Sequence, residues 1–239
     1  MDFFGQVVDW FSDPTHWSGP SGVPIRLLEH GWYTVLSLTV ASLIAVPLGL
    51  FVGHTHRGEF LVASLANLWR ALPSFAVLGI TFIAFLGTGL SFTLWPTIVA
   101  MVVLAIPPIL TNTYVGVQGV DPDVVEAARG MGMSPSQVLV RVEVPLAAPL
   151  MVTGLRSAAV QVVATATLAA FVAAGGLGNI IRLGYSAGRD QEVFAGALLV
   201  AVFALLVDAA FGLWERTLRS NRVQPAQAPR AGVLVPPAI

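Results

Sequence analysis

Apolar residues dominate this chain in five long runs, and short polar or glycine-rich stretches separate each run from the next. A helix needs about 20 apolar residues to cross a bilayer. Runs of that length predict an all-α polytopic membrane protein with a transmembrane domain over residues 31–216. Its predicted membrane spans cover residues 32–52, 60–86, 92–114, 144–173 and 191–214.

Two of these runs contain residues that disturb a helix. Arg70 and Pro73 interrupt the second run, which we interpret as one broken helix, with two short segments as the alternative. Pro107 and Pro108 lie in the third run, and we expect them to break the cytoplasmic half of that helix. Helix breaks at membrane depth often line cavities. Arg70 and Pro73 are therefore candidate residues of a translocation path.

The two ends of the chain differ from the runs between them. Residues 1–30 lack the positive segment and the uninterrupted apolar core of a secretory signal. They include a short helix with one apolar side, which we expect to rest in the membrane interface. Residues 217–239 are rich in proline and alanine, which predicts a disordered tail. The apolar side of the N-terminal helix comprises Phe3, Phe4, Val7, Val8, Trp10 and Phe11.

One polar stretch, residues 121–145, breaks the apolar pattern in the middle of the chain. Asp121 is suited to cap a helix that has Pro122 at its first position. Gly130 and Gly132 are suited to end that helix. The first half of the stretch therefore predicts one short helix that lies outside the spans.

The second half of the stretch predicts another short helix. Ser134 precedes Pro135, and Gln137 follows the serine at the spacing of a capping box. Pro145 then starts the next span. A plain connector between helices needs only about 2–8 residues, so two dozen residues with caps favour a docking segment over a mere link. Small residues would let a partner approach the backbone closely, namely Ala127, Ala128, Gly130 and Gly132.

Composition excludes several classes of function. The chain is 56% hydrophobic and only 10% charged, against about 25% charged residues in soluble domains. It has no cysteine, which excludes disulfides, thiol catalysis and thiolate metal sites. A net charge of −1 with no basic block argues against a nucleic-acid partner. All twelve basic residues are arginine, so the chain cannot supply the lysine of an ATP-binding phosphate loop.

Arginine also predicts the orientation, because cytoplasmic segments carry the excess of positive charge. Five spans place the two termini on opposite sides. With the N-terminus outside and the C-terminus inside, seven arginines lie inside and three outside. Residues 121–145 are then cytoplasmic. The inside arginines are Arg57, Arg129, Arg141, Arg216, Arg219, Arg222 and Arg230, and the outside ones are Arg26, Arg182 and Arg189.

Polar residues within the spans are candidates for the translocation path. Arg156 and Asp208 lie at depths compatible with an ion pair, and each is alternatively a path-lining residue. His54 and His56 flank a turn, and two histidines without further ligands make a poor metal site. No metal or cofactor is predicted. The remaining candidates serve equally well as helix–helix hydrogen bonds, and they are Asn112, Thr113, Gln161, Thr165 and Thr167.

The polar stretch resembles the EAA motif of ATP-binding-cassette (ABC) importer permeases. That motif reads E-A-A-x3-G-x9-I-x-L-P, and this chain departs from it only by valine at the isoleucine and leucine positions. Residues 70–79 and 112–181 resemble the branch of that family that imports osmoprotectants. The matching motif residues are Glu126, Ala127, Ala128, Gly132, Val142, Val144 and Pro145.

The resemblance implies a type I ABC-importer permease (MetI-like) fold, with about five transmembrane helices and cytoplasmic coupling helices. The EAA motif would dock on a separate ATPase subunit, and Gly175 and Gly176 would lie near the outer mouth of the path, where a gating role is open. The implied partners are that ATPase, a second permease copy or paralogue, an extracytoplasmic substrate-binding protein and the bilayer. The implied location is the cytoplasmic membrane of a prokaryote.

The resemblance implies a non-catalytic subunit that carries glycine betaine, choline, carnitine or proline betaine. Another small solute, such as an amino acid, stays open. A secondary transporter would be expected to show internal repeats and several embedded acids, whereas the chain shows no repeat and one such acid. A membrane hydrolase needs a nucleophile and a base at matched depth, whereas the four histidines lie outside the spans or at their edges.

Overall fold

The computed structural model describes residues 3–90, 94–172 and 175–220, and within these ranges the chain forms helices and turns without any strand. This confirms the predicted all-α class. The helices are α1 (Phe3–Ser12), α2 (Val23–Thr55), α3 (Glu59–Arg70), α4 (Ser74–Ala84), α5 (Trp95–Gln118), α6 (Pro122–Gly130), α7 (Pro135–Val138), α8 (Val144–Ala169), α9 (Gly178–Ser186) and α10 (Asp190–Ser220). A 3₁₀ turn (Pro14–Trp17) follows α1, and a π-helical turn (Leu139–Glu143) joins α7 to α8.

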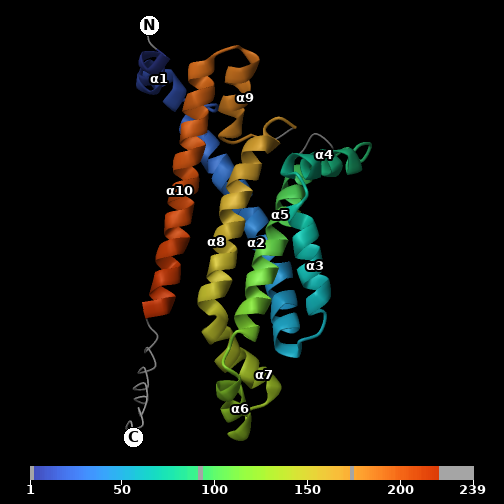
Figure 1. Ribbon diagram of the computed structural model, residues 1–239. Helices are drawn as coiled ribbons and strands as arrows, with labels where there is room; N and C mark the ends of the chain where they lie inside the picture. The colour runs from blue at the N-terminus through green and yellow to red at the C-terminus, as the bar shows by residue number, and fades with distance from the viewer. Residues whose placement is uncertain (1–2, 91–93, 173–174, 221–239) are drawn as a thin grey trace, which may run out of the picture.

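Four helical segments of the described residues are long and apolar enough to cross a membrane. They are α2, α5, the run from α7 through α8, and α10. The pair α3 and α4 raises the count to five if it is taken as one span. Figure 1 shows the long segments side by side, with α1 and α9 at one end of the bundle and α6 and α7 at the other.

The second predicted span is the one that departs most from a straight helix. The axes of α3 and α4 differ by 98°, and Figure 1 shows α4 lying across the direction of α3. With 12 residues, α3 covers about 18 Å, less than the roughly 30 Å of the hydrocarbon layer. Pro73 sets this bend, because it lacks the N–H that would continue the ladder and it precedes α4 as its N-cap.

The expected break at Pro107 and Pro108 does not occur. Both prolines lie inside α5, which is continuous from Trp95 to Gln118. The neighbouring residues Leu104 and Ile109 are buried against other helices. Packing on several sides therefore keeps the helix together although two backbone donors are missing.

Several helices extend beyond the apolar runs that predicted them. Helix α2 begins at Val23, so the expected domain boundary at residue 30 falls inside a helix. Helix α10 continues to Ser220, past the expected boundary at residue 216. These end turns contain charged and polar residues, so the apolar runs are shorter than the helices. Helix α8 ends at Ala169. Three predicted parts lie outside the described residues, namely the end of the 144–173 span, the start of the 92–114 span and residues 221–239.

The core of the bundle is built around α5, which packs between α2 and α8. Small residues allow these helices to approach closely. A Cβ added to Gly49 of α2 would lie 2.6 Å from the Thr113 Cβ of α5. One added to Gly154 of α8 would lie 2.9 Å from the Pro108 carbonyl oxygen. The largest buried side chains of this core include Leu78, Met101, Leu104, Ile109 and Val162.

The bundle has two distinct ends. Helices α1 and α9 lie at one end, which we call the N-terminal end, and α6 and α7 lie at the other, which we call the EAA end (Figure 1). At the N-terminal end the rings of Phe3 and Phe4 meet Phe194 of α10 at centroid distances of 5.6 and 6.4 Å. Part of the apolar side expected to face lipid is thus used for packing within the chain.

Candidate functional site

The EAA segment, residues 121–145, opens with the predicted helix. The side chain of Asp121 accepts a hydrogen bond from the Asp123 N–H at 2.9 Å, and Pro122 occupies the first turn of α6. The helix ends at Gly130, and Gly132 has a φ of +83°. A left-handed backbone of this kind favours glycine. The cap and the stop signal predicted for this helix are confirmed.

The second predicted helix, α7, is confirmed together with its capping box. The Gln137 N–H donates to the Ser134 hydroxyl at 3.4 Å, and the Ser134 N–H donates to the Gln137 side chain at 2.8 Å. Helix α7 does not stop before the next span, however. It passes through the π-helical turn, in which the Val144 N–H donates to the Leu139 carbonyl, directly into α8. The helical run therefore extends from Pro135 to Ala169.

The EAA segment presents an exposed apolar surface at the end of the bundle. Met131 is 77% exposed and Val140 is 63% exposed, and Val124 is exposed as well. Glu126 and Ala127 are also exposed. Large apolar side chains left in contact with water at one place mark interaction surfaces, so this end of the molecule is suited to bind another protein.

Two of the motif's small residues have different environments. Ala128 is buried, and the fully buried Val138 of α7 packs in the same segment, so Ala128 is covered by the chain itself rather than open to a partner. Gly132 is open, because a Cβ added to it would meet nothing within 4 Å. Glu126 is exposed, and it borders the same cavity as Arg129. Val142 is half-buried and Pro145 is exposed.

Most of the candidate path residues bond to their own helix. The polar side chains of Asn112, Thr113, Thr165 and Thr167 each donate to the carbonyl oxygen four residues earlier, at 2.7–3.2 Å. Thr113 and Thr165 are buried. Gln161 is exposed on α8. The structure therefore does not bring these residues together into one polar lining within a single chain.

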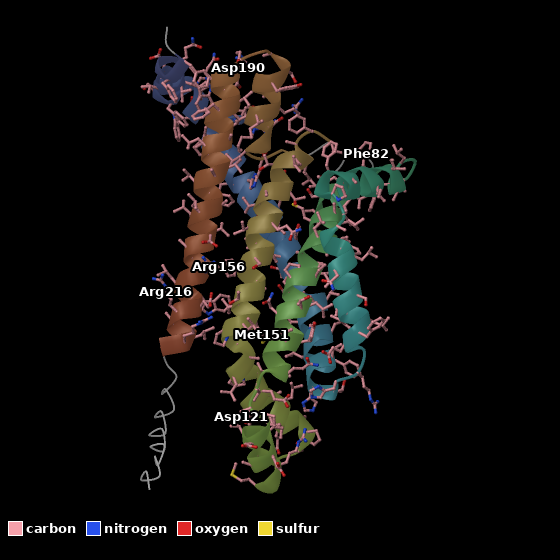
Figure 2. The ribbon with its side chains drawn as sticks, viewed as in Figure 1. Phe82, Asp121, Met151, Arg156, Asp190 and Arg216 are labelled. Atoms are coloured by element: carbon pink, nitrogen blue, oxygen red, sulfur yellow. The ribbon has the colours of Figure 1, made fainter. Side chains whose placement is uncertain are left out.

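Arg156 and Asp208 form the predicted ion pair. The Arg156 Nε and Nη2 donate to the two carboxylate oxygens of Asp208, both at 2.6 Å, and Glu215 lies 3.7 Å from the same guanidinium. Figure 2 shows Arg156 midway along α8 on the side toward α10, far from Asp121 and Asp190. Both side chains of the pair are 36% exposed. This pair joins α8 to α10.

The glycine-rich stretch lies at the N-terminal end, far from the EAA segment (Figure 1). Gly176 has a φ of +79°, and its N–H donates to the Glu29 carboxylate at 2.8 Å. A Cβ on Gly175 would lie 2.5 Å from the same carboxylate. Glu29, which the sequence did not single out, therefore determines the position of this stretch. Of the other expected path residues, Pro73 is exposed at the start of α4, and the side chain of Arg70 lies outside the described residues.

A second pair that the sequence did not reveal joins the EAA segment to α2. His54 Nδ1 of α2 and Glu143 Oε2 of the π-helical turn are 2.6 Å apart. They border a cavity of about 640 Å³, whose other polar lining residues include Gln118, Glu126 and Arg129. His54 appeared in the sequence only as half of a weak metal site. In the described parts of the chain, no group of three potential metal ligands occurs.

The sequence of this chain is similar to those of known transport proteins over most of its length. Residues 45–220 match the family described as "Binding-protein-dependent transport system inner membrane component". The choline transport system permease protein OpuBB of Bacillus subtilis is 35% identical over 83% of this chain and 89% of its own length. The carnitine transport permease protein OpuCB of Listeria monocytogenes is 34% identical over 92% and 97%. The osmoprotectant import permease protein OsmW of Salmonella typhimurium is 32% identical over 75% and 84%.

Solved structures agree with the fold. An inward-facing structure of the MetNI methionine ABC transporter aligns with a TM-score of 0.71 at 23% identity, over 82% of this chain and 95% of the matched chain. A crystal structure of an amino acid ABC transporter aligns with a TM-score of 0.66 at 20% identity, over 91% and 99%. At these identities the likeness concerns the fold alone, and it confirms the predicted permease fold.

Proposed function

The chain belongs to the family of binding-protein-dependent transport system inner membrane components, and from that premise we propose that it carries a quaternary-ammonium osmoprotectant through an ABC importer. The solute class is glycine betaine, choline, carnitine or proline betaine. Relatives named for choline, carnitine and osmoprotectant transport, at 32–35% identity over most of the chain, support this class.

The observation that carries the proposal is the EAA segment. Two capped helices project from one end of the bundle and expose Met131 and Val140. A separate ATPase subunit would bind this surface, with α6 and α7 seated in its groove. Closure of the ATPase on ATP would then move the segment and, through α8, the spans. The solute would cross by alternating access between the two sides of the membrane.

A second permease subunit completes the proposed transporter. Arg156 and Asp208 are each 36% exposed in the middle of α8 and α10. Charged groups within a bilayer are costly unless they face protein or a water-filled cavity. A second copy or a paralogue would cover such surfaces and enclose a path with this chain. An extracytoplasmic binding protein would deliver the solute at the end opposite the ATPase.

We place the N-terminus outside and the C-terminus inside, as the arginine distribution favours. Figure 1 shows the EAA segment and α9 at opposite ends of the bundle, so a cytoplasmic EAA segment would place α9 outside. The chain has no cysteine, so single cysteines report position directly. A cysteine at Ser134 should react with an impermeant reagent only from the cytoplasm, and one at Gly188 only from outside. The reverse labelling pattern would overturn the orientation.

Uptake by a reconstituted system tests the function. Proteoliposomes would contain this chain, its ATPase subunit and the binding protein, and uptake of labelled betaine, choline and carnitine would be measured with ATP or a non-hydrolysable analogue inside. ATP-dependent uptake of at least one quaternary amine is expected. Uptake without ATP would indicate a secondary transporter. ATP-driven uptake of an amino acid alone would reject the solute class and retain the permease.

A further inference from the structure

Glu143 is a buried carboxylate at the junction between the EAA segment and α8. It is 5% exposed, and its Oε2 lies 2.6 Å from His54 Nδ1. A buried carboxylate is stable only where it is paired and hydrogen-bonded. Because a carboxylate accepts and does not donate, the His54 Nδ1–H must be the donor. This short bond therefore links the junction directly to α2.

The two residues of this bond come from parts of the chain that are 89 positions apart. Glu143 belongs to the helical run that carries α7 into α8, so backbone bonds already link the EAA segment to α8. Helix α2 has no such backbone connection to the segment. Helix α2 can follow the movement of the segment only through side-chain contacts, either by packing on α5 and α8 or through the bond to Glu143.

Other contacts at this end of α2 lead to α5, because Gly53 lies closely against Val117 and the His56 ring is 3.4 Å from Gln118 Nε2. The His54–Glu143 bond differs from them because it joins α2 directly to the π-helical turn. The cavity of about 640 Å³ lies between the end of α2, the end of α5 and α6, and it separates Glu126 and Arg129 of α6 from Gly53 and His54 of α2. Side chains across an open space cannot transmit a displacement by packing. The bond between His54 and Glu143 crosses the edge of this cavity.

The π-helical turn gives Glu143 its direction. Turns of this kind add one residue to a helical turn and are frequent at functional sites. Within the turn, Glu143 points inward and is buried, whereas Arg141 is exposed. The wider turn thus places a carboxylate on the side that faces α2.

We propose that the His54–Glu143 hydrogen bond is the joint through which movement of the EAA segment reaches α2. The inference rests on the proposed function, because it assigns a positioning role within an ATP-driven permease. Neither residue touches the solute or ATP in this scheme. Loss of the joint would leave α8 moving with the ATPase while α2 follows incompletely, so ATP would be hydrolysed with less solute transported.

The test measures uptake and ATP hydrolysis in the same proteoliposomes. In His54→Ala and Glu143→Ala we expect the solute carried per ATP to fall about tenfold, because each leaves the other group buried without its partner. His54→Asn should restore the ratio, since the asparagine amide can donate from the place of Nδ1. Glu143→Gln should also restore it, since its carbonyl still accepts. His56→Asn is the matched control. His56 borders the same cavity but its ring lies 3.4 Å from Gln118 of α5 and not against Glu143, and its φ of +56° is one that asparagine tolerates.

If the single variants fail to assemble, the double variant His54→Leu, Glu143→Met carries the same test, because it removes both polar groups together. Spin labels on cysteines at Arg57 and Arg141, both exposed, add a direct measurement. Their separation should stay constant on ATP binding in the wild type and change in the double variant.

The outcomes separate the two proposals. Uptake and hydrolysis that fall in parallel, or that stay at wild-type levels, would overturn the joint and leave the permease assignment intact. A label separation that responds to ATP in the same way in wild type and double variant would overturn it too. A wild-type complex without ATP-driven uptake would overturn the proposed function, and the joint with it.

Discussion

Polar side chains hold the two ends of the bundle in different ways. At the N-terminal end they bond to backbone groups of distant segments. The Glu29 carboxylate accepts from the Gly176 N–H at 2.8 Å, and the His30 ring donates to the Val163 carbonyl oxygen at 3.1 Å. A buried apolar cluster that includes Trp10, Leu177 and Ile180 closes over the same end.

At the EAA end the long-range bonds join one side chain to another. His54 meets Glu143 at 2.6 Å, and Gln118 donates to Glu59 at 3.2 Å. A polar cavity lies beside them, and apolar residues of the segment remain exposed. A bond between a side chain and the backbone contains one rotatable side chain, whereas a bond between two side chains contains two. We therefore expect the N-terminal end to be the more rigid end and the EAA end the more mobile one.

The largest disruption of the N-terminal end is expected from Gly178→Ala. A Cβ at this position would overlap the Thr167 carbonyl group of the α8 backbone, which cannot rotate away. We expect a loss of stability of about 3 kcal/mol, at the upper end of overpacking effects. Thermal unfolding in detergent, followed by tryptophan fluorescence, measures it. The control is Gly5→Ala, whose Cβ meets nothing within 4 Å; equal unfolding temperatures would show that this end is less rigid than we describe.

At the EAA end, Gly132→Trp should stop transport without unfolding the spans. A tryptophan must adopt the φ of +83° at a strain of about 1–3 kcal/mol, and its ring would occupy the open space in which we propose that the ATPase binds. We expect normal membrane insertion together with loss of ATPase co-purification and uptake. Gly188→Trp is the matched control, because this glycine also has a positive φ and open surroundings but lies at the other end. If the Gly132→Trp variant assembles normally with the ATPase, the EAA segment is only a connector between two helices.

Glu29→Ala probes the bond to the glycine-rich stretch. The Gly176 N–H would lose its acceptor, and the expected loss of stability is about 1–2 kcal/mol. The effect is moderate because the Glu29 side chain is 33% exposed. Glu29→Gln keeps an acceptor and should recover most of the loss. Asp9→Ala, which removes an exposed carboxylate of α1, should change the unfolding temperature little. If alanine and glutamine at position 29 behave alike, the bond to Gly176 contributes no stability.

The smallest expected effect is that of Ser134→Ala. It removes the side chain that caps α7, which typically costs about 1 kcal/mol. We expect the ATPase to bind about fivefold more weakly, since that energy corresponds to roughly this factor, with little change in the stability of the spans. Ser134→Thr retains the hydroxyl and serves as the control. Binding that is equally weak in both variants would assign the effect to shape rather than to the cap.

Residues close in sequence made the EAA segment predictable. The Asp121 cap, the Ser134–Gln137 capping box and the turn at Gly132 each involve groups at most a few residues apart. Their geometry follows from local backbone chemistry. The ion pair of Arg156 and Asp208 was predictable for a different reason, because charges at similar depths in a membrane have few other partners.

The effect of proline was not predictable from its position. Pro73 accompanies a 98° bend, whereas Pro107 and Pro108 lie inside an unbroken helix. The proline ring removes a donor in all three places. What differs is the packing around it: α5 is enclosed by α2 and α8, whereas Pro73 is exposed.

The sequence by itself determined the helical class, the approximate place of the four long apolar segments, and the two capped helices between them. Apolar run length and helix capping act over neighbouring residues, and a backbone in lipid must satisfy its own hydrogen bonds. Only the tertiary structure decided that His54 meets Glu143 and that Glu29 accepts from Gly176. These partners are 89 and 147 positions apart. Their contact depends on how closely α2, α5 and α8 pack, and no local pattern in the sequence encodes that distance.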